Sequence, residues 1–159
     1  MKTIILGLGN PILGDDGVGW RVAQWLQDQL SACGEPFVEV DCASLGGLSL
    51  MERMIGYERV ILVDAMATGQ RPVGSVQVIP LEALPNPSAG HSTSAHDVSL
   101  LTALQTAKAM GLPIPQIVEV VAIETDRVYD FCEELSPVIA AAVPLACQRV
   151  LNLLEKERI

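Results

Sequence analysis

Three aspartates and one histidine are the residues of this sequence best suited to carry out chemistry. Asp15 and Asp16 follow a glycine-rich turn, Asp64 ends an apolar run, and His96 stands just before a helical pattern. Carboxylate oxygens and an imidazole nitrogen form an incomplete ligand shell, which leaves positions for water or for a partner's ligands. Imidazole suits nickel and zinc, so a borderline divalent metal fits this donor set better than copper(I) or an iron–sulfur cluster.

Each of these residues also has an ordinary structural explanation. Acidic residues just before a helix, such as Asp15 and Asp16, cap its amides and interact favourably with its dipole. Asp64 alone could be a polar residue at a strand end, and His96 a solvated residue near a helix N-terminus. The functional interpretation depends on convergence, because the first and third strands of a parallel sheet end at the same edge, where ligands bind.

Short apolar runs alternate with helical patterns along the chain, and they define the elements that would position these residues. The expected strands are 3–8, 37–40, 57–63, 76–78 and 117–123, and the expected helices begin near 18, 48, 97 and 137. The alternation in 76–78 indicates an antiparallel edge strand. This order predicts an α/β fold, a three-layer sandwich with a twisted, mostly parallel sheet of about five strands and helices on both faces. We expect one domain over residues 1–159.

The glycine-rich turn after the first strand does not fit a nucleotide-binding motif. A dinucleotide fingerprint beginning at Gly7 would need its third glycine at position 12, which is Ile12, and no Gly-Lys-Ser/Thr follows for a phosphate loop. The simple explanation of these glycines is a tight turn that needs positive φ at one of them or more.

The composition and the N-terminal sequence indicate which partners and which cellular compartment to expect. Ten Lys and Arg against nineteen Asp and Glu give a net charge of −9, which repels nucleic acid and anionic membrane surfaces, so we expect neither as a partner. The apolar N-terminus is cut short by Gly9, Asn10 and Pro11, unlike a signal peptide. We therefore expect a cytoplasmic protein. The four cysteines form no Cys-x-x-Cys pair, so we expect buried free thiols.

Four motifs together resemble the hydrogenase maturation proteases, the endopeptidases that process nickel-iron hydrogenase large subunits. Residues Ile5–Gly19 resemble the opening signature of that family, and Val60–Ala65 its second acidic motif. Ser94–Leu100 resembles the histidine motif, and Val121–Glu124 with Leu135–Val138 resembles the C-terminal segment. The similarity spans essentially the whole chain.

This resemblance implies roles for individual residues. Asp16, Asp64 and His96 would contact nickel, with Asp16 ranked above Asp15 and His96 above His91, the other histidine of the chain. Asp41 also matches a family position, although Asp41-Cys42-Ala43-Ser44 stands where the family usually has Asp-Gly-Gly-Thr. Asp16 and Asp41 are the candidates for the catalytic general base of an aspartyl-type endopeptidase.

The implied reaction is hydrolysis of one peptide bond near the C-terminus of a hydrogenase large-subunit precursor, after nickel insertion. Nickel would arrive with the precursor, dock onto the three ligands and report that loading is complete. We expect the protease to be a monomer.

Three alternatives stay open. The first is a non-hydrolytic nickel-binding checkpoint or chaperone module that uses the same ligands, and the second is a small-molecule hydrolase on a similar sheet. The third is a cysteine protease in which Cys42 is the nucleophile and His96 its base.

Overall fold

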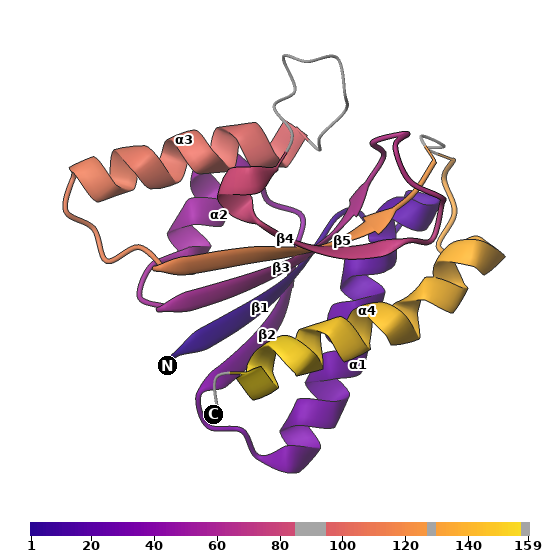
Figure 1. Ribbon diagram of the computed structural model, residues 1–159, viewed down its shortest axis with the longest axis horizontal. Helices are drawn as coiled ribbons and strands as arrows, with labels where there is room; N and C mark the ends of the chain where they lie inside the picture. Colours follow the sequence, from indigo (N-terminus) through magenta and orange to yellow (C-terminus); the bar gives the residue numbers. More distant parts are fainter. Residues whose placement is uncertain (85–94, 127–129, 157–159) are drawn as a thin grey trace.

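The computed structural model describes residues 1–84, 95–126 and 130–156, and within 95–99 it describes the backbone alone. Figure 1 presents the chain as one five-stranded sheet flanked by helices. The strands are β1 (Thr3–Leu8), β2 (Val38–Ala43), β3 (Arg59–Met66), β4 (Val76–Pro80) and β5 (Ile117–Glu124).

The strand order across the sheet is β2-β1-β3-β5-β4. β1 pairs in parallel with β2 and β3, and β3 pairs in parallel with β5, whereas β4 pairs antiparallel with β5 at the edge. The predicted antiparallel edge strand and the mostly parallel sheet are therefore confirmed. The carboxyl ends of β1, β2, β3 and β5 lie along one edge, which is the edge expected to carry the site.

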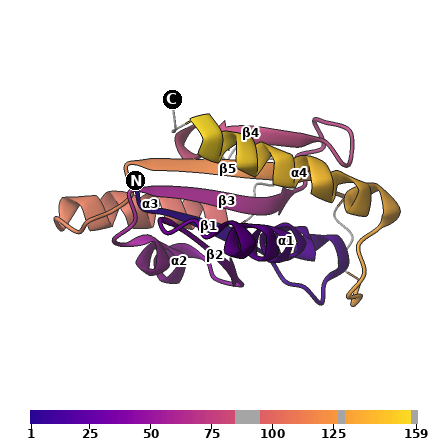
Figure 2. The same ribbon diagram turned by 90° about the horizontal axis from the view of Figure 1, so that it is seen from below.

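Helices cover both faces of the sheet, which confirms the predicted three layers (Figures 1 and 2). α1 (Val18–Cys33) and α4 (Pro137–Glu155) pack on one face, and α2 (Gly47–Met54) and α3 (Ala95–Ala109) on the other. Each face has its own core: Ile61 and Val63 of β3 are buried under α1 and α4, and Leu62 is buried under α2 and α3. Two short 3-10 helices, η1 (Gly14–Gly17) and η2 (Leu81–Ala83), precede α1 and α3.

All strands but β1 continue past the ends predicted from the sequence: β4 reaches Pro80, β5 reaches Glu124, and β2 and β3 each run three residues further. β2 extends through Asp41 to Ala43, and β3 extends through Asp64 to Met66, because Asp41 pairs with Leu6 and Asp64 pairs with Ala122. A polar residue inside a parallel ladder keeps its backbone hydrogen bonds, so it need not end the strand. The expectation that Asp41 and Asp64 mark strand ends is therefore wrong.

α4 is long and apolar enough to cross a membrane by length and composition alone. In this fold one of its faces packs against the sheet, where Ile139, Ala146 and Val150 are buried. Its apolar residues therefore contribute to the core of an α/β domain.

Candidate active site

The turn between β1 and α1 brings the carboxylate of Asp16 to the end of β1. Asp16 lies in η1, and its Oδ2 accepts a hydrogen bond from the backbone N–H of Asn10 at 2.8 Å. Gly9 permits this approach, since it adopts φ +122° and a Cβ there would lie 2.0 Å from the carbonyl oxygen of Asp16. A side chain at position 9 would displace Asp16.

Two further glycines allow α1 to approach the sheet closely. A Cβ at Gly19 would lie 2.3 Å from the carbonyl oxygen of Val63 and 2.4 Å from that of Leu8. A Cβ at Gly7 would lie 2.3 Å from the carbonyl oxygen of Gly19. The prediction of positive φ is thus confirmed at Gly9, whereas at Gly7 and Gly19 the requirement is space between helix and strand.

Asp15 has a different contact from its neighbour. Its Oδ1 accepts the backbone N–H of Ser136 at 2.7 Å, and its Oδ2 accepts the Ser136 hydroxyl at 2.8 Å. Ser136 is the N-cap of α4, and the N-cap residues of η1, α1 and α4 all lack a side-chain capping hydrogen bond. The expectation that Asp15 and Asp16 cap the helix that follows them is therefore wrong, because Asp15 bonds to the start of α4 and Asp16 to Asn10. Both aspartates do lie in the first turn of η1, where a carboxylate interacts favourably with the helix dipole.

A backbone bridge ties the turn that carries Asp16 to the segment before α4. The N–H of Gly14 donates to the carbonyl of Cys132 at 2.7 Å, and the N–H of Cys132 donates to the carbonyl of Ile12 at 3.0 Å. The turn is therefore held at both Asn10 and Gly14.

Asp64 lies inside β3, and only 2% of its surface is exposed. It pairs with Ala122 of β5, and because Val63 pairs with Gly7, the last residue of β1 lies beside Asp64. Side chains alternate along a strand, and Leu62 and Met66 belong to the core under α2 and α3. The Asp64 side chain therefore projects from that same face.

His96 is the second residue of α3, and the N-terminal end of α3 lies toward the edge at which β3 and β5 end (Figure 1). The next helical turn is anchored there by Leu100, which is fully buried in the core under α2 and α3. The His96 side chain, and the whole of His91, lie outside what the structure describes.

The structure thus brings Asp16 and Asp64 to the same end of β1, and it places the backbone of His96 at the same edge. Among the described side chains, no three His, Cys, Asp or Glu residues form a group that could hold a metal ion. The ligand set Asp16, Asp64 and His96 therefore stays a prediction.

Asp41 belongs to a separate cluster of charges at the β2 edge. Its Oδ2 lies 3.0 Å from a guanidinium nitrogen of Arg53 in α2, and its Oδ1 accepts the N–H of Cys42 at 2.8 Å. The same guanidinium contacts Glu39 at 2.7 Å, and the Tyr57 hydroxyl donates to Glu39. The Tyr57 hydroxyl, and next the Arg53 guanidinium, lower the pKa of Glu39 below its ordinary value.

The sheet register separates Asp41 from Asp64. Asp41 pairs with Leu6 and Leu6 with Leu62, so Asp41 is two strands from β3 and two residues short of the level of Asp64. At about 4.8 Å per strand and 3.3 Å per residue, the two backbones are on the order of 10 Å apart. The structure does not bring Asp41 and Asp64 into contact.

The cysteines are free, but they are not all buried. Cys147 is buried, Cys42 is half-buried, and Cys33 and Cys132 are exposed, so the expectation of buried thiols is wrong for the last two. The Cys42 thiol lies 3.8 Å from the carbonyl oxygen of Trp20 in α1, on the face opposite α3. Burial, with the Asp41 charge second, raises the pKa of Cys42, which disfavours its thiolate.

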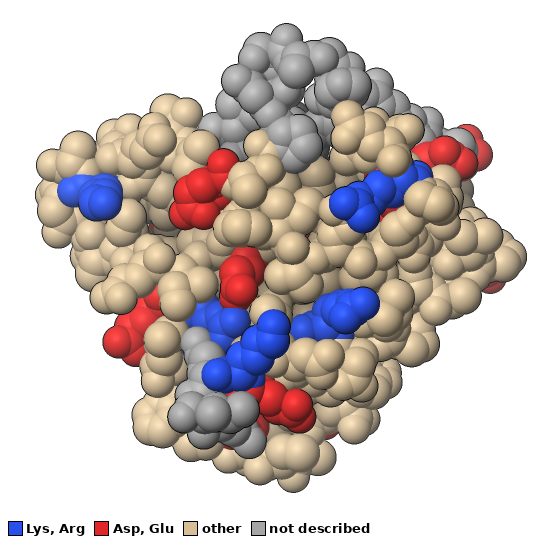
Figure 3. Space-filling model, viewed as in Figure 1, with Lys and Arg blue, Asp and Glu red and all other residues tan. Residues whose placement is uncertain are grey.

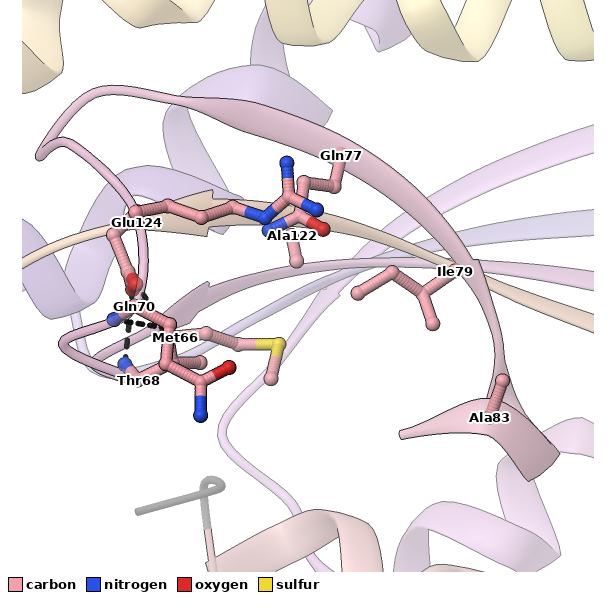
Figure 4. Close-up of a pocket in the computed structure, with 9 residues that line it drawn as sticks. Met66, Thr68, Gln70, Gln77, Ile79, Ala83, Ala122 and Glu124 are labelled. Carbon is pink, nitrogen blue, oxygen red and sulfur yellow. Dashed lines mark hydrogen bonds between the residues drawn. The ribbon is translucent and has the colours of Figure 1, made fainter. Parts of the chain in front are cut away.

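A cavity of about 250 Å³ lies over β4 and the ends of β3 and β5, and it includes Ala122, the residue of β5 that pairs with Asp64 (Figure 4). At one end Glu124 is buried and accepts hydrogen bonds from Thr68, from its N–H at 2.9 Å and from its hydroxyl. Neither residue of this pair is among the site residues predicted from the sequence. The available signal was an acidic residue at the end of the apolar run 117–123, the same pattern that drew attention to Asp64. The cavity is lined by Met66, Thr68, Gln70, Arg71, Gln77, Ile79, Ala83, Ala122 and Glu124.

Of the six acidic residues of 119–134, two have an ion-pair or hydrogen-bond partner, and four are exposed: Asp126, Asp130, Glu133 and Glu134. Glu119 forms an ion pair with Arg59 at 2.6 Å, and Glu124 is held by Thr68. On the face drawn in Figure 3, acidic and basic side chains lie interspersed among uncharged ones.

The fold and the carboxylates at its edge define an α/β protein with an acidic site where its parallel strands end. The chain belongs to the hydrogenase maturation protease family, because the family model of that description, HycI, matches residues 21–153. The family resemblance drawn from the motifs is confirmed.

Individual relatives agree with this assignment over nearly the whole chain. The hydrogenase expression/formation protein HoxM of Cupriavidus necator is 27% identical over 97% of this chain and 74% of its own length. The hydrogenase 2 maturation protease of Escherichia coli is 22% identical over 100% of this chain and 94% of its own. The solved structure of the maturating endopeptidase HybD from E. coli has a TM-score of 0.81, at 22% identity, over 99% of this chain and 94% of that one. The last likeness supports the fold.

Proposed function

We propose that this chain is the endopeptidase that removes the C-terminal extension of a nickel-iron hydrogenase large-subunit precursor after nickel insertion. Membership of the maturation protease family supports the reaction class. The observation that carries the site is the convergence of Asp16 in η1 and Asp64 in β3 at the end of β1. Nickel is part of the substrate in this proposal.

The donor set suits the recognition of nickel held by another protein. Asp16, Asp64 and His96 would supply two oxygens and one nitrogen, and the precursor's own ligands would complete the shell. Asp16 uses Oδ2 to accept the Asn10 amide, and its Oδ1 has no hydrogen bond among the described residues. One carboxylate oxygen is therefore oriented by the protein while the other can face the precursor.

Hydrolysis needs a base that takes a proton from the attacking water. Asp16 and Asp41 are the two candidates, and the structure favours Asp16, because the Asp41 carboxylate is held by Arg53 and lies two strands from Asp64. Nickel in the precursor would act as a Lewis acid and fix the position of the bond to be cut. Asp64, which is buried beside β1, would be a fixed ligand.

A direct test uses purified precursor with and without nickel. Each form is incubated with this protein, and the products are weighed by intact-mass spectrometry. We expect a released C-terminal peptide and a shortened precursor from the nickel-loaded form alone. If the loaded precursor binds but is never cut, the endopeptidase proposal fails and the checkpoint module takes its place. Equal cutting of both forms would refute the role of nickel.

We also propose that the protein works in the cytoplasm as a monomer. The β4 edge of the sheet ends at Pro80, a residue that hinders pairing between sheet edges. Light scattering after gel filtration should give a mass near the 17.0 kDa of one chain. A mass of twice that value would contradict the monomer.

A further inference from the structure

The cavity lies on the same face of the sheet as Asp64, and two of its lining residues share a row of the sheet with that aspartate. Asp64 pairs with Ala122, and Ala122 pairs with Gln77, so the three residues form one row across β3, β5 and β4. Residues paired in this way point to the same face of a sheet. Ala122 and Gln77 both line the cavity, so its floor begins one strand away from Asp64.

The distance from Asp64 to Gln77 along this row determines which residue of a bound peptide would reach the cavity. At about 4.8 Å between strands, Gln77 lies on the order of 10 Å from Asp64, which an extended peptide spans with about three residues. The volume of about 250 Å³ lies below the 300–1,000 Å³ typical of sites for whole small molecules. A space of this size suits one or two amino-acid side chains.

The lining favours an uncharged side chain. Met66, Ile79 and Ala83 surround the open part of the cavity together with Ala122, while Thr68 and Glu124 lie at one end (Figure 4). Glu124 is already held by Thr68, and Arg71 supplies one positive charge to offset it. Gln70 and Gln77 carry amides that can bind the backbone of an extended peptide.

We propose that this cavity is a specificity pocket of the protease, which takes an uncharged side chain of the precursor two or three residues from the bond that is cut. The inference builds on the proposed function. The pocket contributes to substrate binding without touching the reacting atoms, so filling it should raise KM more than it lowers kcat.

The test first fills the pocket with a larger side chain of the protease, and then removes the precursor side chain that would occupy it. Gln77→Phe places a ring in the cavity from β4, and Ala83→Leu enters it independently from η2. Val78→Phe is the matched control, because Val78 is the next residue of the same strand and points to the other face. Each protein is assayed on the natural precursor and on precursors in which each of the three residues on either side of the cut bond is replaced by Gly.

We expect Gln77→Phe to lower kcat/KM on the natural precursor by about 10-fold or more, mainly through KM, and Val78→Phe to leave it within about 3-fold of wild type. One Gly-substituted precursor should restore cutting by Gln77→Phe, since the smaller residue leaves room for the ring. Wild-type rates for both Gln77→Phe and Ala83→Leu would contradict the specificity pocket without contradicting the endopeptidase function. Failure of the wild-type protein to cut any precursor would instead refute the proposed function, and the pocket with it.

Discussion

The carboxylate of Asp15 accepts two hydrogen bonds from Ser136, which lies 121 positions later in the chain, at 2.7 Å from the backbone N–H and 2.8 Å from the hydroxyl. Its neighbour Asp16 accepts from Asn10 at the end of β1 instead. The two adjacent aspartates therefore divide their tasks: Asp15 joins the start of α4 to the rest of the fold, and Asp16 faces the proposed site.

Substitution of each aspartate should separate these tasks. Asp16→Asn should lower the rate of precursor cutting by about 100-fold or more, because an amide cannot act as the base, and should leave the urea midpoint nearly unchanged. Asp15→Ala should lower the free energy of unfolding by about 1–2 kcal/mol through the loss of contacts at a helix N-terminus, and should keep cutting measurable. Urea unfolding and mass spectrometry of the products measure both effects. Normal cutting by Asp16→Asn would refute the assignment.

Substitution of each histidine tests the prediction that His96 contacts nickel. His96→Ala should abolish cutting of the nickel-loaded precursor, because the site would lose its imidazole ligand. His91→Ala is the matched control and should cut at the wild-type rate. The circular dichroism spectra of both variants should match that of the wild type. Loss of cutting in His91→Ala with retention in His96→Ala would reverse the assignment of the two histidines.

Cys42 should be dispensable for the reaction. Its thiol faces the Trp20 carbonyl, and burial raises its pKa, so it is a poor nucleophile at neutral pH. Cys42→Ala should therefore cut the precursor within about 3-fold of the wild-type rate. In the folded wild type, a thiol reagent should label Cys33 and Cys132 first, and should leave Cys147, whose pKa burial raises to about 11, unmodified. Complete loss of cutting in Cys42→Ala would revive the cysteine-nucleophile alternative.

Gly19 should tolerate no side chain. In Gly19→Ala the added Cβ would meet the backbone carbonyls of Leu8 and Val63, so α1 must move away from the sheet. We expect a loss of about 3 kcal/mol or more in the free energy of unfolding. Gly34→Ala is the comparison, since Gly34 adopts φ +66° with no atom within 4 Å of the added Cβ, and should cost only about 1–2 kcal/mol. Equal losses in the two variants would mean that close packing at Gly19 is unimportant.

The Glu39 cluster should make stability depend on pH in the acid range. The pKa of Glu39 is lowered from its ordinary 4.5 in the folded protein, first by the Tyr57 hydroxyl and then by Arg53. This contribution is therefore present above about pH 4.5 and is lost as the pH falls through the lower, folded pKa. The thermal midpoint of Glu39→Gln should lie below that of the wild type near neutral pH, and the difference should vanish in acid. Because the Glu39 side chain is 49% exposed, we expect a small effect. A difference that is constant with pH would contradict this origin.

The order of elements could be predicted from the sequence because it depends on local patterns. The helical patterns predicted helices beginning near 18 and 137, where α1 and α4 begin. Strand ends were harder to predict, because the pairing of Asp41 with Leu6 and of Asp64 with Ala122 depends on neighbouring strands. Pattern alone does not reveal how far such a ladder continues.

The site could be predicted only in part for the same reason. The motifs directed attention to Asp16 and Asp64, and the fold brings both to the end of β1. The contact of Asp15 with Ser136 and the pairing of Asp41 with Arg53 join distant segments, and no local spacing signals them. The cavity is likewise built from three strands, the loop between β3 and β4, and η2, so it becomes visible only in the folded chain.

The bridge between Gly14 and Cys132 has a consequence for the thermodynamics of substrate binding. Fixing the backbone of a flexible residue costs about 1–2 kcal/mol of conformational entropy. The segment that carries Asp16 is already ordered by its bonds to Cys132 and by the Asn10 amide before any precursor arrives. Binding energy from the precursor therefore need not be used to freeze this loop, and it stays available for discriminating one protein tail from another.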